Sequence, residues 1–143
     1  MREVLPQAGT PFGDRVRQRL RDERVIWLTT IGADGTPQPN PVWFLWQEPD
    51  SLLVYNRADA HRLVHVAARP RVALHLDGDG RGGDVLVLTG SATVETDAPL
   101  AHEHPEYLAK YVDAATRVGG SPAEFAAQYP VALRVRVDKV RGF

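Results

Sequence analysis

The alternation of apolar and polar residues along the chain predicts a mainly antiparallel β structure with a few helices. Strands are expected at 25–31, 37–47, 52–55, 72–76, 84–96 and 131–137. Helical spacing predicts helices over 14–23, 60–69 and 99–118, and a short one that leads to Tyr129. Hairpin-linked strands favour a six-stranded antiparallel barrel with flanking helices over a doubly wound sheet. The predicted class is therefore mainly β, of the α+β type.

The stretch from 52 to 76 carries the most specific local signal. An apolar strand is followed by the polar loop 56–59, in which Asp59 is well placed to cap a helix. Spacing of three and four residues assigns that helix an apolar face of Ala60, Leu63, Val64 and Ala67. The opposite, solvent-facing side then carries Arg62, His65 and Arg69. The helix is expected to stop at Pro70, because the residue before a proline is pushed out of the α region.

Polar and basic side chains gather in that loop and in the first turn of the helix, namely Asn56, Arg57, His61 and Arg62. The first N–H groups of a helix lack internal partners, and guanidinium groups bind phosphate well. The pattern therefore predicts an anion site suited to phosphate. Arginines at a helix start are also common as solvated surface charges, and the residues alone leave that alternative open.

A second informative stretch runs from Pro37 to Trp46. Its prolines alternate at 37, 39 and 41 and cannot donate ladder hydrogen bonds, so this half is predicted to be an edge, a bulge or a contact surface. The half from Val42 to Trp46 is apolar on both faces and needs a cover on each. One cover is the core, and the second is expected to be another subunit or a flat ligand. Of the four side chains from Trp43 to Trp46, at least two are expected to be explained by core packing alone. The apolar run from Val85 to Leu88 strengthens the expectation of a homodimer.

Composition narrows the class of protein. The 143 residues are expected to form one domain, 1–143, with a flexible lead-in over 1–11. A formal net charge of −1 argues against a nucleic-acid partner, and zero cysteines exclude disulfides and thiolate metal sites. The sequence contains neither an apolar run of about 20 residues, as a membrane span needs, nor the core of a signal peptide. A cytoplasmic protein without a membrane partner is expected.

Several weaker motifs are expected to be structural. The glycines at 78, 80 and 83 match G-x-G-x-x-G but precede a strand, so they predict a turn and not a dinucleotide site. The run His102-Glu103-His104 resembles metal ligands, yet no third ligand has a recognisable spacing, so a solvated helix start and no metal site are expected. His75 lies within an apolar strand and is expected to be a hydrogen-bonded core histidine.

Taken in order, four blocks of the sequence resemble the flavin- and deazaflavin-binding split β-barrels, typified by pyridoxamine 5'-phosphate oxidase. The blocks are the 26–30 strand with its Asp-Gly hairpin, 37–44, 55–71, and Leu88-Thr89-Gly90-Ser91-Ala92. The resemblance covers about 14–141 and looks closest to the actinobacterial branch that uses the deazaflavin coenzyme F420. It implies a homodimer with the cofactor in a groove between subunits.

The resemblance also implies where the cofactor lies. Its phosphate would be held by Arg62, which stands where the family usually has lysine, and by the surrounding Asn56, Arg57 and His61. The ring would be lined by Asn40, Pro41, Val42 and Trp43, largely through their backbone. The basic flavin-contacting strand and the C-terminal arginine motif of the oxidase itself are missing. With the chain ending at Phe143, pyridoxamine phosphate oxidation is not expected.

The implied function is hydride transfer between reduced F420 and an unidentified organic acceptor, with the cofactor supplying the redox chemistry. An FMN-dependent oxidoreductase on the same fold is the first alternative, and a non-catalytic flavin or haem carrier is the second. Solvent, Tyr111 or His65 could supply a proton, and Lys110 and Arg117 are candidates for contacting the cofactor's polyglutamate tail.

Overall fold

A computed structural model describes residues 3–143. Its strands are β1 (Val25–Ile31), β2 (Pro37–Trp43), β3 (Leu45–Gln47), β4 (Ser51–Asn56), β5 (Arg71–His75), β6 (Leu86–Val94) and β7 (Val131–Gly142). Its helices are α1 (Pro11–Asp22), α2 (His61–Ala68), α3 (Pro105–Gly119) and α4 (Pro122–Gln128), and one 3-10 turn, η1, spans Ala101–Glu103. The predicted order of strands and helices is confirmed, except that one predicted strand is divided in two.

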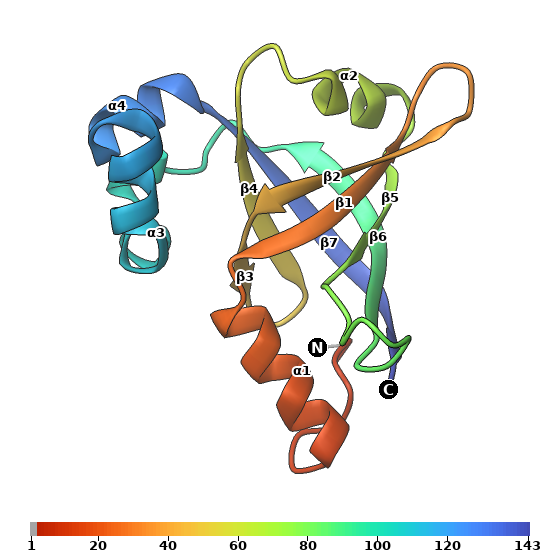
Figure 1. The fold of residues 1–143 in the computed structure, drawn as a ribbon. Coiled ribbons are helices and arrows are strands. Elements are labelled where there is room, and N and C mark those ends of the chain that lie inside the picture. The colour runs from red at the N-terminus through yellow and green to blue at the C-terminus, as the bar shows by residue number, and fades with distance from the viewer. Residues whose placement is uncertain (1–2) are drawn as a thin grey trace.

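The strands form one antiparallel sheet in the order β2-β1-β5-β6-β7-β4-β3. The two outer strands of that order, β2 and β3, follow each other directly in the chain, so the sheet curls round towards itself as a half-barrel (Figure 1). α1 lies at one end of the curled sheet, α2 lies over the other end, and α3 and α4 stand to one side of it (Figure 1). The predicted antiparallel barrel with flanking helices is confirmed.

The number of strands is seven and not the six expected, because the predicted strand 37–47 divides at Phe44. Before this residue β2 pairs with β1, and after it β3 pairs with β4. At the break the Phe44 backbone bonds to α3 instead of to a strand. Its N–H donates to the Tyr111 hydroxyl at 3.0 Å, and its carbonyl accepts from Lys110 Nζ at 2.9 Å. Two side chains from α3 thus replace the missing ladder partners.

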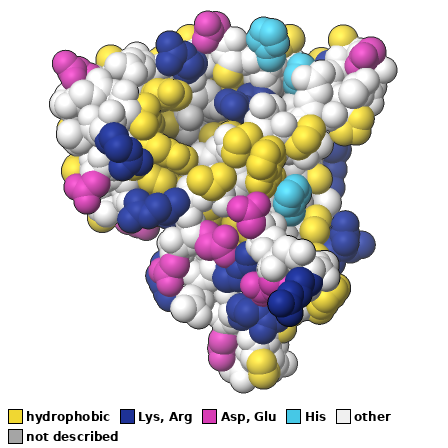
Figure 2. Space-filling model, in the orientation of Figure 1, with side chains coloured by type: hydrophobic (Ala, Val, Ile, Leu, Met, Phe, Trp, Pro, Cys, Tyr) yellow, Lys and Arg dark blue, Asp and Glu magenta, His cyan; other side chains and the backbone are white. Residues whose placement is uncertain are grey.

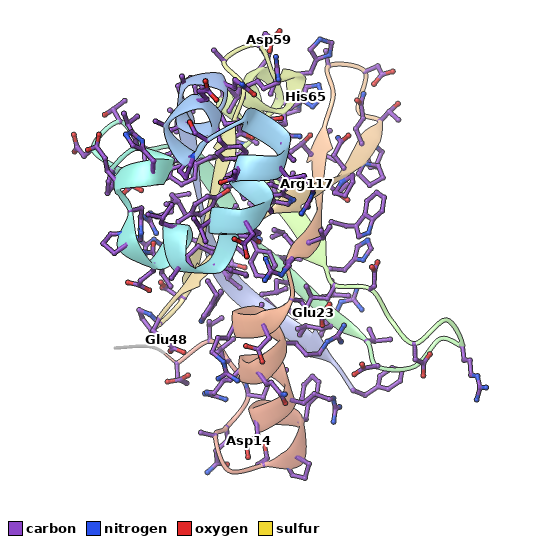
Figure 3. The ribbon with its side chains drawn as sticks, turned by 60° about the vertical axis from the view of Figure 1, so that its left-hand side comes forward. Asp14, Glu23, Glu48, Asp59, His65 and Arg117 are labelled. Atoms are coloured by element: carbon purple, nitrogen blue, oxygen red, sulfur yellow. The ribbon has the colours of Figure 1, made fainter. Side chains whose placement is uncertain are left out.

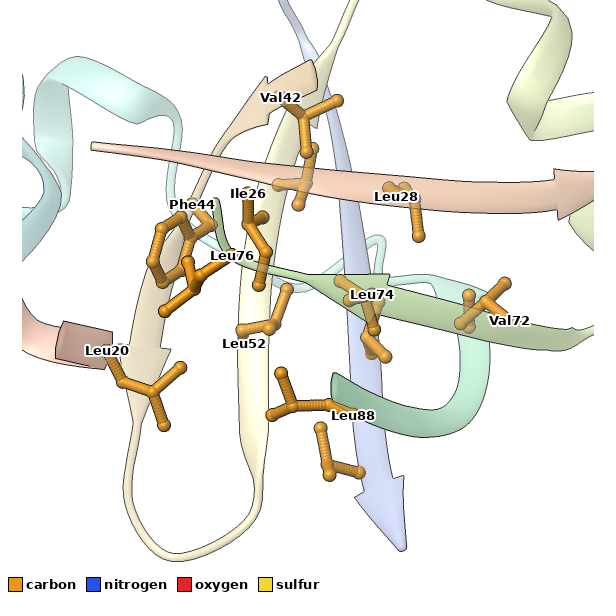
Figure 4. Close-up of a cluster of buried hydrophobic side chains, with 14 of the residues drawn as sticks. Leu20, Ile26, Leu28, Val42, Phe44, Leu52, Val72, Leu74, Leu76 and Leu88 are labelled. Atoms are coloured by element: carbon orange, nitrogen blue, oxygen red, sulfur yellow. The ribbon is translucent and has the colours of Figure 1, made fainter. Parts of the chain in front are cut away.

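An aliphatic cluster fills the inside of the curled sheet (Figure 4). Leucines from three different strands, Leu52, Leu74 and Leu88, have no exposed surface. α1 closes one end of the cluster with Leu20, which is also fully buried. Burial of such side chains stabilises a fold by about 1.5–3 kcal/mol each relative to exposure, so this cluster is the main stabilising element.

A second, aromatic cluster lies between the outside of the sheet and the helices α3 and α4. Side chains of the chain segment around Phe44 alternate between the two clusters: Val42 and Phe44 enter the aliphatic one, whereas Trp43 and Leu45 contact the aromatic one. Helices of the same chain cover Leu45, so the expectation that a second subunit or a ligand covers the outer face is corrected for that residue. Trp43 is only partly buried by the same helices.

The helix α2 turns a different face inward from the one predicted. Val66 is its buried residue, whereas Val64 is 70% exposed and Ala67 is also exposed. The side of the helix that carries Arg62 therefore faces the protein and not solvent. The sheet lies beneath the Arg62 and Val66 side of the helix, so tertiary contacts overrode the local apolar pattern. Asp59 is not the cap either, because the N-cap is Ala60 and no side chain caps this helix (Figure 3).

The start of the chain is packed more closely than its lack of periodicity indicated. α1 begins at Pro11, three residues before the predicted start at residue 14, and its cap is Thr10, whose hydroxyl accepts from the Gly13 N–H. Leu5, in the segment expected to be flexible, is 4% exposed within the aliphatic cluster. Residues 1–2 of that segment lie outside the described part of the chain. Arg19 of α1 donates a hydrogen bond to the Asp84 carbonyl at 2.8 Å.

Two histidines also differ from expectation. His75 is exposed and its ring stacks on that of Trp27, with centroids 6.2 Å apart, so it is not a core histidine. His104 is buried at 7% exposure and caps α3, and its Nε2 lies 3.3 Å from the Gln47 amide nitrogen. The predicted solvated helix start is therefore wrong at this residue. The glycine-rich segment after β5 is a loop, as predicted.

Candidate functional site

A cavity of about 520 Å³ opens between the sheet, the start of α2 and the helices α3 and α4. Figure 2 shows hydrophobic side chains gathered across the middle of this face, with basic side chains around them. The cavity is lined by Pro41, Val42, Trp43, Tyr55, Arg57, Ala60, Arg62, Tyr107, Val118, Phe125 and Tyr129. A cavity that is mostly apolar and aromatic, with a few polar groups at one end, is typical of a small-molecule or cofactor site.

Aromatic rings form one wall of the cavity. Trp43 stacks on Phe125, with ring centroids 5.2 Å apart, and Phe125 stacks on Tyr129 at 4.5 Å. Tyr55 and Tyr107 meet edge to face at 4.7 Å. Stacked and edge-to-face contacts of this kind hold rings in fixed orientations. The wall therefore consists of aromatic rings in fixed orientations, and surfaces of this kind pack well against a planar ligand.

Arg62 supplies the charge at the other end of the cavity. Its guanidinium is half-buried and donates to Asn56 Oδ1 at 2.8 Å. Asn56 is itself 1% exposed and is fixed by hydrogen bonds from its Nδ2 to the Val54 and Val131 carbonyls at 3.0 and 3.1 Å. Burial lowers the pKa of Arg62 below its ordinary value. No carboxylate of residues 3–143 forms an ion pair with Arg62, whose charge has the neutral amide of Asn56 and the phenol of Tyr129 beside it.

Arg57 lies at the same end and is exposed. Its guanidinium carbon is 5.5 Å from the centroid of the Tyr129 ring, a cation–π contact that links the basic end to the aromatic wall. The first turn of α2 begins beside it without a side-chain cap, so its leading N–H groups have no side-chain acceptor. Two guanidinium groups and an uncapped helix start form a positive end suited to an anion.

The proline-rich strand β2 forms the edge of the sheet at this cavity. Pro37, Pro39 and Pro41 pair with Ile31, Thr29 and Trp27 of β1 but have no N–H to donate. The ladder hydrogen bonds must therefore run through the residues between them, and the proline carbonyls point to the outer edge. The outer edge of β2 therefore has carbonyl acceptors but no N–H donors at these three positions. Another strand cannot form a regular ladder with such an edge, but its carbonyls can accept a hydrogen bond from a ligand N–H.

The structure brings together most of the residues predicted to bind the cofactor. Pro41, Val42, Trp43, Arg57 and Arg62 line the cavity, and Asn56 lies directly behind it as the partner of Arg62. Asn40 and His61 are exposed and are not among the lining residues.

Sequence reasoning missed the part of the wall that comes from after residue 100. Tyr107, Phe125 and Tyr129 line the cavity, and burial raises the pKa of Tyr107. The sequence feature that could have indicated this wall is an excess of aromatic residues in the helical region 104–129. Core packing accounts for that excess equally well. Tyr55 was assigned to a strand but not to the site, although its ring is in the wall.

Other candidate groups lie away from the cavity. The Tyr111 hydroxyl is engaged at Phe44 and lies 2.6 Å from the Arg24 carbonyl, and burial raises the pKa of this tyrosine, so the hydroxyl has a structural role. His65 Nδ1 lies 2.8 Å from the Thr30 hydroxyl (Figure 3). Lys110 lies in a different groove, and Arg117 on α3 lines a smaller depression of about 340 Å³ that shares Trp43 with the cavity (Figure 3).

Residues 3–143 contain no group of three or more His, Asp or Glu side chains arranged to hold a metal ion. Within the same residues, no helix has both the length and the apolar character needed to cross a lipid bilayer.

The sequence matches a protein-family model over most of its length, in agreement with the fold described above. The family model described as pyridoxamine 5'-phosphate oxidase matches residues 12–143. No curated protein matches the chain by sequence.

Three solved structures resemble the chain along most of their length. An F420 reductase is 23% identical with a TM-score of 0.66, and the match covers 96% of this chain and 98% of that one. General stress protein 26 from Bacillus anthracis is 19% identical with a TM-score of 0.65 and 89% coverage of both chains. A conserved hypothetical protein from Mycobacterium tuberculosis is 18% identical with a TM-score of 0.65, covering 99% of this chain and 87% of that one. Likeness at these identities establishes the shared fold.

Proposed function

The chain belongs to the pyridoxamine 5'-phosphate oxidase family, and from that premise we propose that it transfers a hydride from reduced coenzyme F420 to an organic acceptor. Members of this family are often flavin-binding oxidoreductases, so an enzyme of that broad class is plausible. The choice of the deazaflavin is the specific part of the proposal. It is supported by the resemblance of the sequence blocks and by the likeness to an F420 reductase.

The observation that carries the proposal is Arg62. A half-buried guanidinium costs free energy unless an opposite charge or good hydrogen bonds compensate it. Here the nearest fixed partner is the neutral Asn56, which orients the guanidinium without neutralising it. A cofactor phosphate would supply the missing negative charge, and the first N–H groups of α2 lie at the same end of the cavity. The residues present therefore fit the phosphate of a flavin or deazaflavin.

The aromatic wall and the strand edge fit the ring of the same cofactor. Trp43 and Tyr55 offer apolar surface, while the outward carbonyl of Pro41 can accept a ring N–H. When bound, the deazaflavin would supply the hydride chemistry. The chain would bind and orient it: Arg62 and Arg57 hold the charged part, β2 lines one edge of the ring, and the α3–α4 wall excludes water.

The site as proposed is completed by a second copy of the chain. We infer a homodimer because the cavity is open on one side and exposed apolar residues remain near its rim, among them Val118, which is 50% exposed. The proposed acceptor is a small organic molecule that enters from this open side. Sedimentation at micromolar concentration tests the dimer, and a monomer there would contradict it.

FMN is the second candidate cofactor. The features that bind phosphate, Arg62 and the start of α2, do not distinguish FMN from F420, and the family as a whole favours flavins. A non-catalytic flavin or haem carrier is the remaining alternative. The tyrosines and arginines that line the cavity fit the planar, anionic character of a flavin or of a haem. Among residues 3–143, however, no histidine lines the cavity to ligate a haem iron.

The deciding experiment is a titration of the purified protein with F420 and with FMN under identical salt and pH, followed by fluorescence of each cofactor. We expect saturable binding of F420 that is at least about tenfold tighter than binding of FMN, a difference of about 1.4 kcal/mol. Tighter binding of FMN would transfer the assignment to the flavin while leaving the site in place. Failure of both cofactors to bind would overturn the proposal.

A further inference from the structure

Tyr107, in the first turn of α3, lines the proposed cofactor cavity with a hydroxyl that the fold does not use. The residue is 2% exposed. Within residues 3–143 its hydroxyl forms no hydrogen bond. A buried hydroxyl without a partner costs free energy, and such a group in a native protein is commonly explained by a catalytic role or by a bound water or ion. Because Tyr107 lines the cavity, its hydroxyl is available to a ligand there.

The other three of the chain's four tyrosines use their side chains differently. The hydroxyls of Tyr55 and Tyr111 each donate to a backbone carbonyl at 2.6 Å, so their protons are committed to the fold. Tyr129 is only partly buried and lies at the basic end of the cavity, with the Arg57 guanidinium over its ring. Among the described residues, Tyr107 is therefore the tyrosine that combines deep burial with a free hydroxyl.

The position of the Tyr107 ring is fixed by its neighbours. Its centroid lies 4.7 Å from that of Tyr55, which it meets edge to face, and 4.9 Å from that of Tyr111. Its backbone N–H donates to the His104 side chain, which caps α3. The hydroxyl is therefore held in the aromatic part of the cavity. A donor that is already in place needs no reorganisation when negative charge develops next to it.

We propose that Tyr107 is a catalytic residue whose hydroxyl binds a carbonyl oxygen of the acceptor and stabilises the negative charge that develops on that oxygen during reduction. The inference rests on the proposed function, in which the reduced cofactor supplies the hydride. In an acceptor whose C=C bond is conjugated to the carbonyl, the hydride forms a bond to the β-carbon, the C=C π bond breaks and an electron pair moves to the oxygen. A proton from solvent then reaches the α-carbon, so the acceptor gains one hydride and one proton, and Tyr107 keeps its own proton.

The surroundings of Tyr107 favour an uncharged acceptor. Burial, together with the neighbouring tyrosines, raises the pKa of Tyr107, so its hydroxyl remains a hydrogen-bond donor at neutral pH. The basic residues that line the cavity, Arg57 and Arg62, lie at its other end, where the proposed phosphate would occupy them. A carboxylate beside Tyr107 would thus have aromatic rings around it and no cation to balance its charge. A planar carbonyl compound fits this part of the cavity better.

The hydrogen bond is tested on the full chain without cofactor, with para-dimethylaminobenzylideneacetone as the probe. This planar, uncharged enone has an absorption band that moves to longer wavelength when its carbonyl accepts a hydrogen bond. We expect the band of the bound probe to lie at longer wavelength in the wild type than in Tyr107→Phe. The dissociation constant should rise about two- to tenfold in the variant, the effect of one neutral hydrogen bond. Because the hydroxyl has no partner among residues 3–143, the variant should be no less stable than the wild type in urea.

Tyr111→Phe is the matched control, because it removes a hydroxyl one turn further along α3 from a residue that does not line the cavity. It should lower stability but keep the wild-type band position and probe affinity. The difference between wild type and Tyr107→Phe should also persist when oxidised F420 or FMN, whichever binds, is present, since acceptor and cofactor must be bound together.

Equal band positions in the wild type and Tyr107→Phe would overturn the proposal. Displacement of the probe by the cofactor would overturn it too, as would a loss of stability in Tyr107→Phe as large as that in Tyr111→Phe. Failure of both cofactors to bind would instead overturn the proposed function, and a band difference without cofactor would still identify Tyr107 as the hydrogen-bond donor to a carbonyl ligand.

Discussion

The two apolar clusters of this protein differ in chemistry and in what they enclose. The cluster inside the curled sheet is mostly aliphatic, and its central leucines have no exposed surface. The cluster under α3 and α4 is mostly aromatic, and several of its rings also form the cavity wall. Trp43 and Phe44, adjacent in the chain, belong one to each.

The two clusters therefore have different roles, one in stability and the other in both stability and ligand binding. Branched aliphatic side chains pack to high density and leave no space for a ligand, so the sheet interior stabilises the fold. Aromatic rings have broad, flat faces. One face can pack against the protein while the other packs against a planar ligand. Substitutions in the first cluster should therefore change stability, whereas those around the second should divide between stability and binding.

The largest effect is expected from Leu88→Ala, in the centre of the aliphatic cluster. Leu88 has no exposed surface and pairs with Leu74 and Val140 on the neighbouring strands, so the shortened side chain leaves a cavity. The free energy of unfolding should fall by about 2–5 kcal/mol in urea denaturation. The matched change Leu100→Ala, at a residue that is 42% exposed, should cost less than about 1 kcal/mol. Equal losses from the two variants would mean that the sheet interior is not the main source of stability.

Arg62→Ala should chiefly affect binding. Loss of a charge-assisted hydrogen bond costs about 1.5–3 kcal/mol, so the dissociation constant for the proposed cofactor should rise about ten- to hundredfold. Arg62→Lys should lose less, because it keeps the charge but not the bidentate geometry. Cofactor titration of each variant measures this.

The control for that titration is Arg81→Ala, an exposed arginine in the loop after β5, which should bind as the wild type does. Because Asn56 Oδ1 loses its donor in Arg62→Ala, stability should also fall, by about 1 kcal/mol. An unchanged dissociation constant would show that the phosphate lies elsewhere.

Tyr111→Phe separates the two roles within the aromatic cluster. The ring would still stack on Trp43, with centroids 5.0 Å apart, but the buried Phe44 N–H would lose its acceptor. We expect the free energy of unfolding to fall by about 1–3 kcal/mol while the cofactor affinity changes little. Tyr129→Phe, at the rim of the cavity, should leave stability nearly unchanged. If Tyr111→Phe weakened binding without loss of stability, the hydroxyl would belong to the site instead of the strand break.

A further effect is expected at alkaline pH. Burial raises the pKa of Tyr55 to about 12 and raises the pKa of Tyr107 and Tyr111 as well. In the unfolded chain tyrosines lose their protons near pH 10, so above this pH the folded state binds more protons than the unfolded state. The free energy of unfolding should therefore fall from about pH 10 to pH 12.

Denaturant unfolding of the wild type and of Tyr55→Phe across that pH range measures the effect. The decline should be shallower in the variant, because one of the tyrosines that retain their proton has been removed. Identical slopes would show that Tyr55 does not contribute to it.

Local pattern determined much of the fold. The order of the strands along the chain, the Asp-Gly hairpin and the end of α2 before Pro70 were predictable. They depend on the alternation of apolar and polar residues and on backbone preferences, which act over a few residues. The grouping of Asn56, Arg57 and Arg62 was predictable for the same reason, because these residues lie within seven positions of the chain, at the end of β4, in the loop after it and in the first turn of α2.

Only the tertiary structure decided which faces are buried and what completes the cavity. The strand break at Phe44 depends on Tyr111, 67 residues further along the chain, and the aromatic wall depends on where α4 docks. The inward face of α2 was mispredicted because Val64 and Val66 are equally apolar, and the position of the sheet selected Val66. Contacts of this range are made by packing and by pairing distant backbone groups, and no short segment of the sequence encodes them.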